Sequence, residues 1–140
     1  MMEEILKKEN LNWNMSGYDE VWNDRFLFFQ MNGAPNTKTF KQGLKKLPTL
    51  IMKLRILINF YALLSGFIYF FIKGMWKSAV AIIGLGIACF ITCLFVPESF
   101  HSTLVISYIF FCGMRANYLY YRKEVLGKDD FNIFQGMRFF

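Results

Sequence analysis

The sequence predicts an all-α membrane protein, in which amphipathic N-terminal helices precede a transmembrane helical hairpin and one further hydrophobic segment. Of its 140 residues, 55% are hydrophobic and 19% aromatic, and both shares exceed those of typical soluble domains. Between Ile56 and Tyr121 the formal charges are restricted to Lys73, Lys77, Glu98 and Arg115. A soluble domain of this size could not bury three apolar stretches of about 17 to 20 residues. We therefore expect lipid to surround these stretches.

The net charge of +6 is concentrated beside the apolar stretches, whereas residues 1–35 are acidic on balance. Basic residues in such flanking positions orient membrane segments and contact anionic lipid headgroups. We expect no nucleic-acid partner, because neither a recognised nucleic-acid-binding fold nor an aromatic stacking motif accompanies the charge. The flanking basic residues are Lys38, Lys41, Lys45, Lys46, Lys53 and Arg55 before the stretches, and Arg115, Arg122, Lys123 and Lys128 after them.

Residues 1–49 are predicted to form a cytoplasmic N-terminal arm with two amphipathic helices, since the first residues lack the apolar core and cleavage site of a signal peptide. Ser16 and Asp19 resemble a capping box, which predicts a first helix over residues 17–31. This helix would carry Tyr18, Trp22, Phe26 and Phe29 on one stripe. An isolated helix of this length is marginal in water. We therefore expect the stripe to contact the membrane interface, the following helix or another protein.

A second amphipathic helix is predicted to start near Thr37, after a turn over residues 32–36 that contains Gly and Pro. Its apolar stripe of Phe40, Leu44 and Leu47 is surrounded by lysines. This pattern is typical of a helix that lies on an anionic membrane surface. Pro48 is expected to end or kink the helix.

Residues 50–121 are predicted to form the membrane domain, and residues 122–140 a short cytoplasmic tail. Hydrophobic segments cover residues 50–72, 78–96 and about 100–119. The third segment is long enough to span only if the Arg115 side chain snorkels toward the headgroups. Tyr118, Tyr120 and Tyr121 would then form an aromatic belt at the same interface.

The distribution of Lys and Arg predicts the orientation. The connection over residues 73–77 contains two lysines, and the tail is basic, whereas residues 97–102 contain no Lys or Arg. The positive-inside rule thus places the first connection and the C-terminus in the cytoplasm, and residues 97–102 outside. The basic stretch before residue 50 favours the cytoplasm as well, so two arrangements of residues 50–72 stay open. One is a re-entrant or interfacial hairpin that turns near Ser65–Gly66; the other is three simple spans with the C-terminus outside.

We expect no catalytic, cofactor or metal site. His101 shares a short polar turn with Glu98, but adjacency there does not hold the groups in a catalytic geometry. Cys89 and Cys93 lie on one helical face without further ligands for a metal. The candidate residues are instead contacts for lipid or a partner, because they are aromatic or cationic and lie near the predicted interface. They are Trp22, Phe26, Phe29, Lys73, Trp76, Lys77, Arg115 and Tyr118.

Several short motifs resemble the YigF-like bacterial inner-membrane proteins, a family defined by a domain of unknown function. They are Trp22-Asn23-Asp24-Arg25-Phe26, Asn32-Gly33-Ala34-Pro35-Asn36, Gly74-Met75-Trp76-Lys77 and Arg115-Ala116-Asn117-Tyr118. The resemblance covers roughly residues 20 to 130, and members of the family often have Pro at the position of Phe67. It implies a multi-pass location in the bacterial inner membrane, and no substrate, cofactor or catalytic residue.

These observations predict a small, non-catalytic inner-membrane protein that acts as a regulator or assembly factor through contacts with anionic lipid, a protein partner or a second copy. The alternative is a subunit of an oligomeric transport or permeation module. An intramembrane enzyme that uses Glu98 or His101 is a third and weaker hypothesis. A permeation pathway needs a polar lining, and the available side chains are few: Asn59, Ser65, Thr92, Ser107 and Asn117.

Overall fold

The computed structural model describes residue 11 and residues 13–137, and within these residues the chain contains helices and no strands. The all-helical prediction is therefore confirmed for this part of the chain. The elements are η1 (Met15–Gly17), α2 (Glu20–Asn32), α3 (Lys38–Lys46), α4 (Leu50–Leu57), α5 (Phe60–Ser65), α6 (Phe67–Ile72), α7 (Trp76–Phe95), η2 (Glu98–Phe100) and α8 (His101–Glu124).

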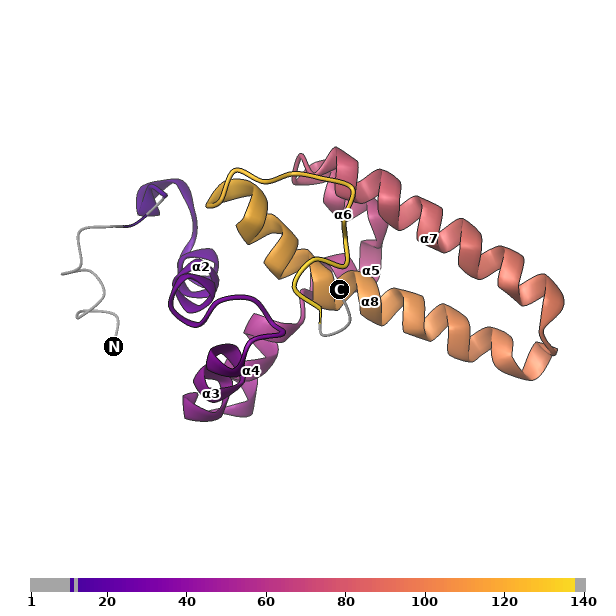
Figure 1. Ribbon diagram of the computed structural model, residues 1–140, viewed down its shortest axis with the longest axis horizontal. Helices are drawn as coiled ribbons and strands as arrows, with labels where there is room; N and C mark the ends of the chain where they lie inside the picture. Colours follow the sequence, from indigo (N-terminus) through magenta and orange to yellow (C-terminus); the bar gives the residue numbers. More distant parts are fainter. Residues whose placement is uncertain (1–10, 12, 138–140) are drawn as a thin grey trace.

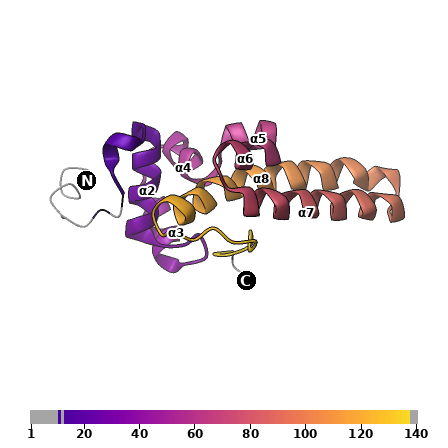
Figure 2. The same cartoon turned by 90° about the horizontal axis from the view of Figure 1, so that it is seen from above.

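Two regions differ in shape. The long helices α7 and α8 run side by side away from the rest of the chain and form a hairpin closed by η2 (Figure 1 and Figure 2). At the other end, α2 and α4 pack against α8 and against each other, and α3 packs against α2. We call this second region, together with residues 125–137, the base. The base begins with η1 and α2, and the α5–α6 pair lies against the part of the hairpin that is nearest the base.

Helix α2 begins at Glu20 because the Asp19 carboxylate accepts a hydrogen bond of 2.9 Å from the Trp22 amide. The predicted capping box is wrong, since the Ser16 hydroxyl donates instead to Asn14 at 2.7 Å. The helix therefore starts three residues later than predicted. The second amphipathic helix is confirmed: Thr37 caps the Phe40 amide at 3.2 Å, and α3 follows directly.

The first hydrophobic segment is not one straight helix but three short ones. The chain is extended at Ile58–Asn59, where the Asn59 side chain caps α5 by accepting from the Ala62 amide at 3.1 Å. The second break is at Gly66, whose φ of +56° favours glycine. This break lies at the predicted Ser65–Gly66 position. Helix α5 packs against α8 and α6 packs against α7, so the two short helices fold back on each other beside the hairpin.

Helix α7 has 20 residues, which is about 30 Å at 1.5 Å per residue. Within the described residues it is the one helix that is long and apolar enough to cross a membrane, and 17% of its most apolar stretch is buried. Helix α8 is longer, with 24 residues, but its second half carries Arg115, Asn117 and Arg122. The two helices approach closely where the Tyr108 hydroxyl donates to the Ile82 carbonyl at 3.1 Å.

Candidate functional site

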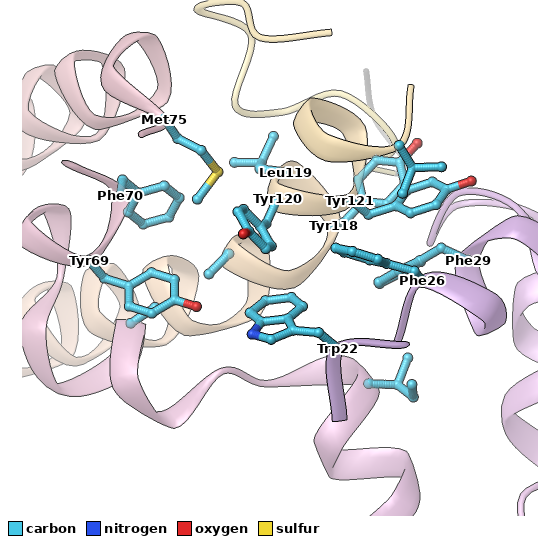
Figure 3. Packing of buried hydrophobic residues seen from close by; sticks show 14 of the residues in the cluster. Trp22, Phe26, Phe29, Tyr69, Phe70, Met75, Tyr118, Leu119, Tyr120 and Tyr121 are labelled. Carbon is cyan, nitrogen blue, oxygen red and sulfur yellow. The ribbon is translucent and has the colours of Figure 1, made fainter. Parts of the chain in front are cut away.

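The base is centred on an aromatic cluster formed by Trp22, Phe26 and Phe29 of α2 and Tyr118, Tyr120 and Tyr121 of α8 (Figure 3). Ring centroids lie 4.6 Å apart for Trp22 and Tyr120, 5.3 Å for Phe29 and Tyr118, and 6.1 Å for Phe26 and Tyr121. All six side chains are buried, and Phe26 is completely so. Each well-oriented aromatic pair adds about 0.5–1.5 kcal/mol beyond the burial of its area. The cluster therefore fastens α2 to α8.

This packing corrects two predictions. The tyrosines do not form an aromatic belt at a lipid interface, because α2 covers them. The stripe on α2, for which three kinds of partner were open, faces α8 of the same chain. Periodicity identified the stripe, but it carried no information on which surface would cover it. Direct contact with lipid or a separate partner is consequently not the role of Trp22, Phe26, Phe29 or Tyr118 in this fold.

Cationic side chains surround the edge of the aromatic cluster. The Lys73 Nζ lies 5.5 Å from the Trp22 ring centroid and 5.3 Å from that of Tyr120. The Arg25 guanidinium lies 4.6 Å from the Trp22 centroid, and its Nε donates to the Arg55 carbonyl at 2.8 Å. Burial lowers the pKa of Arg25 from its ordinary value. The Lys73 contacts place the loop before α7 against α2 and α8, and the Arg25 hydrogen bond joins α2 to the end of α4.

The predicted interfacial turn over residues 73–77 is joined to residues that follow α8. The Lys77 Nζ donates to the Asp129 carbonyl at 3.1 Å, and the Trp76 ring lies 5.7 Å from that of Phe131. Trp76 nevertheless remains 52% exposed. Lipid contact by this side chain stays a prediction, while Lys77 has an intramolecular partner.

Arg115 is the most deeply buried of the candidate cations, with 4% of its surface exposed. Its Nε donates to the Ile133 carbonyl at 2.8 Å, and its Nη2 donates to the Gln135 carbonyl. The prediction that Arg115 snorkels is therefore wrong, because backbone carbonyls from the segment after α8 bind the guanidinium inside the protein. Its partners are 18 and 20 residues away in the chain, and no local pattern indicates them.

Two buried asparagines form hydrogen bonds with the backbone where the helical run is interrupted between α4 and α5. The Asn117 Nδ2 donates to the carbonyls of Arg55 and Ile56 at 3.1 and 3.0 Å, which are the orphan carbonyls at the end of α4. The Asn59 Nδ2 donates to the Asn117 Oδ1 at 3.1 Å and to the Tyr69 hydroxyl at 2.9 Å. Asn117 is completely buried and Asn59 nearly so. Sequence reasoning noted both asparagines among the few polar side chains of the apolar segments, and Asn117 also in a motif of the family resemblance, but it missed this structural role.

One acidic residue in the base balances part of the positive charge. The Tyr18 hydroxyl donates to Glu124 Oε2 at 2.6 Å, and the Lys123 Nζ donates to Glu124 Oε1 at 2.8 Å. Burial and this contact with Glu124 together raise the pKa of Tyr18 to about 12. The same Lys123 Nζ also donates to the Lys73 carbonyl at 3.1 Å. The end of α8 is thus joined both to the segment before α2 and to the loop before α7.

The lysines and arginines of the described residues lie in the base or at its edge, and none lies at the far end of the hairpin. The sequence has no Lys or Arg between Lys77 and Arg115, so the far end of the hairpin carries none. In the base, α3 presents exposed lysines, and α4, which follows α3 after residues 47–49, presents exposed apolar side chains, with Leu50 71% and Ile51 65% exposed. We call this the α3–α4 surface, and its members are Lys38, Lys41, Lys45, Lys46, Leu50, Ile51 and Met52. Among the residues that the structure describes, no group of three His, Cys, Asp or Glu side chains could hold a metal ion.

Comparison with known proteins gives the family. The family described as "Protein of unknown function (DUF2628)" matches residues 4–125. The uncharacterized protein YigF of Salmonella typhimurium is 31% identical over 124 residues, which cover 86% of this chain and 95% of that protein. The uncharacterized protein YigF of Escherichia coli K12 is 28% identical over the same shares. No solved structure matches. The resemblance to YigF-like proteins is thereby confirmed.

Proposed function

The chain belongs to the DUF2628 family, and we propose that it is a small, non-catalytic protein of the bacterial inner membrane that presents a cytoplasmic base as a regulator or assembly factor. In this proposal α7 and α8 cross the bilayer side by side, and α5–α6 is a re-entrant pair. Because backbone carbonyls bind Arg115 inside the protein, the second half of α8 reaches the cytoplasmic side under a cover of protein and not in contact with lipid. The N-terminus, the base and the C-terminus lie in the cytoplasm, and residues 97–102 lie outside.

The exposed apolar surface of the hairpin carries this proposal. Phe90 is 66% exposed, Leu94 68% and Ile106 53%. So many large apolar side chains exposed on two neighbouring helices are unusual on a soluble monomer. The helix α7 is also about as long as the hydrocarbon core is thick. Lipid as the surrounding medium explains both properties.

The charge distribution supports the proposed orientation. The basic residues before α4, in the loop before α7 and at the end of α8 all belong to the base or its edge. A hairpin that crosses the membrane twice returns the chain to the side on which it started. The fold of α5–α6 does the same for residues 50–72, so every basic cluster can lie on the cytoplasmic side as the positive-inside rule requires.

The α3–α4 surface is the part of the base that we assign to anionic headgroups. Its lysines are exposed and its apolar side chains are uncovered by protein, as expected for a helix pair lying in the interface. Each Lys near an anionic surface contributes about 1 kcal/mol. A protein partner would meet the same face of the base, since the aromatic stripe is used inside the chain.

The few polar side chains of the membrane region support an anchoring role over a permeation role. Asn59 and Asn117 bind each other, while three hydroxyls donate to carbonyls four residues earlier in their own helices. Those hydroxyls belong to Ser65, Thr92 and Ser107. All five side chains are therefore hydrogen-bonded within the chain.

The orientation can be tested by cysteine labelling in spheroplasts. The native Cys89, Cys93 and Cys112 are first replaced by Ala, and single cysteines are then introduced as Ser99→Cys, Lys46→Cys or Lys128→Cys. We expect a membrane-impermeant maleimide to label the first variant in intact spheroplasts and the other two only after lysis. Labelling of Lys128→Cys before lysis would indicate three simple spans and contradict the proposal.

The lipid contact needs a separate test. A bimane attached through Met52→Cys in the cysteine-free chain should be quenched by brominated phospholipid in vesicles of phosphatidylcholine and phosphatidylglycerol. Replacement of Lys38, Lys45 and Lys46 by Gln should reduce the quenching. Equal quenching in the two chains would show that the lysines do not hold α4 at the interface.

A further inference from the structure

A cavity of about 260 Å³ lies where α2, α3, α4, α8 and the segment after α8 meet. Ligand pockets begin at about 300 Å³, so the cavity can take one slender ligand or part of a longer one. Its walls are mainly apolar, and they include Phe29, Phe40, Ile56, Leu57, Phe111 and Met114. Phe29 and Tyr118 of the aromatic cluster and Lys41 of the α3–α4 surface belong to its lining.

The charged residues in the described lining are two cations, Arg115 and Lys41. Only 4% of the Arg115 surface is exposed, and the hydrogen bonds described for this side chain go to two neutral backbone carbonyls. A guanidinium has five N–H donors, and these two bonds use two of them. The ion pairs described for this chain are Arg122–Asp130 and Lys123–Glu124, so neither of them compensates Arg115.

A buried cation without a described anion is costly, because desolvation is repaid only by pairing. Bidentate contact with a carboxylate or phosphate is the interaction for which a guanidinium is best suited. The apolar walls indicate that the rest of the ligand is hydrocarbon. Met114 is 52% exposed and Lys41 is also exposed, so the cavity communicates with the surface beside α4.

We propose that this cavity binds one anionic single-chain amphiphile, with its carboxylate or phosphate between Arg115 and Lys41 and its acyl chain against the apolar wall and out past Met114. A free fatty acid and a lysophospholipid share this chemistry. The inference concerns the base alone and can be tested in detergent, where the orientation of the chain in a membrane has no influence. Its failure and the failure of the proposed function are therefore separate outcomes.

The test is a titration of the delipidated full chain in nonionic detergent, followed by native mass spectrometry. The probes are oleate, oleoyl lysophosphatidate and, as a zwitterion of equal chain length, oleoyl lysophosphatidylcholine. We expect one molecule of an anionic probe per chain, bound about tenfold or more tightly than the zwitterion. The ratio of the dissociation constants of the two anionic probes shows whether the site prefers a carboxylate or a phosphate headgroup. Equal affinity for all three probes would overturn the proposal.

Two variants locate the binding. Arg115→Gln should lose the preference for anionic probes, and Arg115→Lys should restore part of it. Because Arg115 also holds the segment after α8, Met114→Trp provides a second measure: it should fill the cavity from its exposed side and weaken binding about tenfold or more. Its control, Ile106→Trp, lies on the same helix at 53% exposure, outside the cavity lining, and should bind as the unaltered chain does.

Two further results would contradict the assignment. Unchanged binding in Met114→Trp would place the amphiphile elsewhere, on the general apolar surface. A chain that binds no probe until residues 138–140 are deleted would show that the chain itself occupies the cavity.

Discussion

The two halves of α8 have similar aromatic content, but the first half is exposed and the second half is covered by protein. In the first half, Ile106 is 53% and Phe110 47% exposed. In the second half, Tyr118 is 7% and Tyr121 6% exposed, because α2 packs over them. One helix therefore passes from an apolar surface that no protein covers to an aromatic core that protein does cover.

This difference shows that the hydrophobicity of a segment does not reveal whether lipid or a protein core surrounds it. Polar residues accompany the covered half: Arg115 binds two backbone carbonyls and Asn117 completes the end of α4. In the uncovered half Ser107 donates to its own helix and Tyr108 donates to the neighbouring α7, so these polar groups are satisfied within the hairpin. The polar groups of the covered half depend on partners elsewhere in the base, whereas those of the uncovered half need nothing outside the hairpin, as a lipid environment requires.

The largest expected effect is that of Phe26→Ala in the base. Phe26 is completely buried and contacts Tyr120 and Tyr121, so the variant should lower the free energy of unfolding in detergent by about 3–5 kcal/mol. The matched control is Phe90→Ala in the hairpin, where the side chain is 66% exposed. Thermal unfolding measures both variants. If both lose the same unfolding free energy, the base and the hairpin do not differ in how protein covers their aromatic side chains.

Asn117→Leu should have the next largest effect. It leaves the carbonyls of Arg55 and Ile56 and one amide hydrogen of Asn59 without their present partners. Each buried group without a partner costs about 1–3 kcal/mol. Thr92→Val removes a hydroxyl that donates to its own helix at 2.8 Å and should change the unfolding free energy little. Asn117→Leu as stable as the unaltered chain would show that the helix break does not need this amide.

Gly66→Ala tests the turn between α5 and α6. A side chain at φ +56° is strained, and we expect a loss of about 1–3 kcal/mol. Gly84 lies within α7 with nothing within 4 Å of an added Cβ, so Gly84→Ala should be neutral or stabilising by up to about 1 kcal/mol. Chemical denaturation of the two variants in the same detergent compares them, and a Gly66→Ala chain of unchanged stability would contradict the required turn.

The smallest effect concerns acid pH. The hydrogen bond from Arg122, at 3.1 Å to Asp130 Oδ2, holds the pKa of Asp130 below its ordinary value. A carboxyl with a lowered folded-state pKa stabilises the fold above about pH 4 and loses this contribution as the pH falls through the lowered value. The protection factors of the amides of residues 128–137 against hydrogen exchange should therefore fall below about pH 4, and Asp130→Asn should abolish that dependence. Identical pH profiles would contradict the pairing.

Local signals predicted the hairpin well. The apolar run that predicted residues 78–96 became α7 at Trp76–Phe95, because a long uncharged run flanked by lysine and proline has well-marked ends. The break at Gly66 was predictable for the same reason, since glycine between small and apolar residues marks a turn. The cap by Thr37 and the start of α3 also followed from local chemistry.

Long-range partners were not predictable. The partner of the α2 stripe is about a hundred residues away, and Asn59 and Asn117 are 58 residues apart. The carbonyls that bind Arg115 belong to an irregular segment without periodicity. A buried side chain with a distant partner has the same local pattern as one that faces lipid, and this is why the tyrosine belt and the snorkelling arginine were predicted wrongly.

The central claim is that lipid covers the hairpin, and extraction of the native membrane fraction tests it most directly. Membranes from cells that produce the full chain are washed at alkaline pH with carbonate and then centrifuged. We predict that the chain stays in the pellet and enters solution only with detergent. A folded, monodisperse chain in the detergent-free supernatant would contradict the claim.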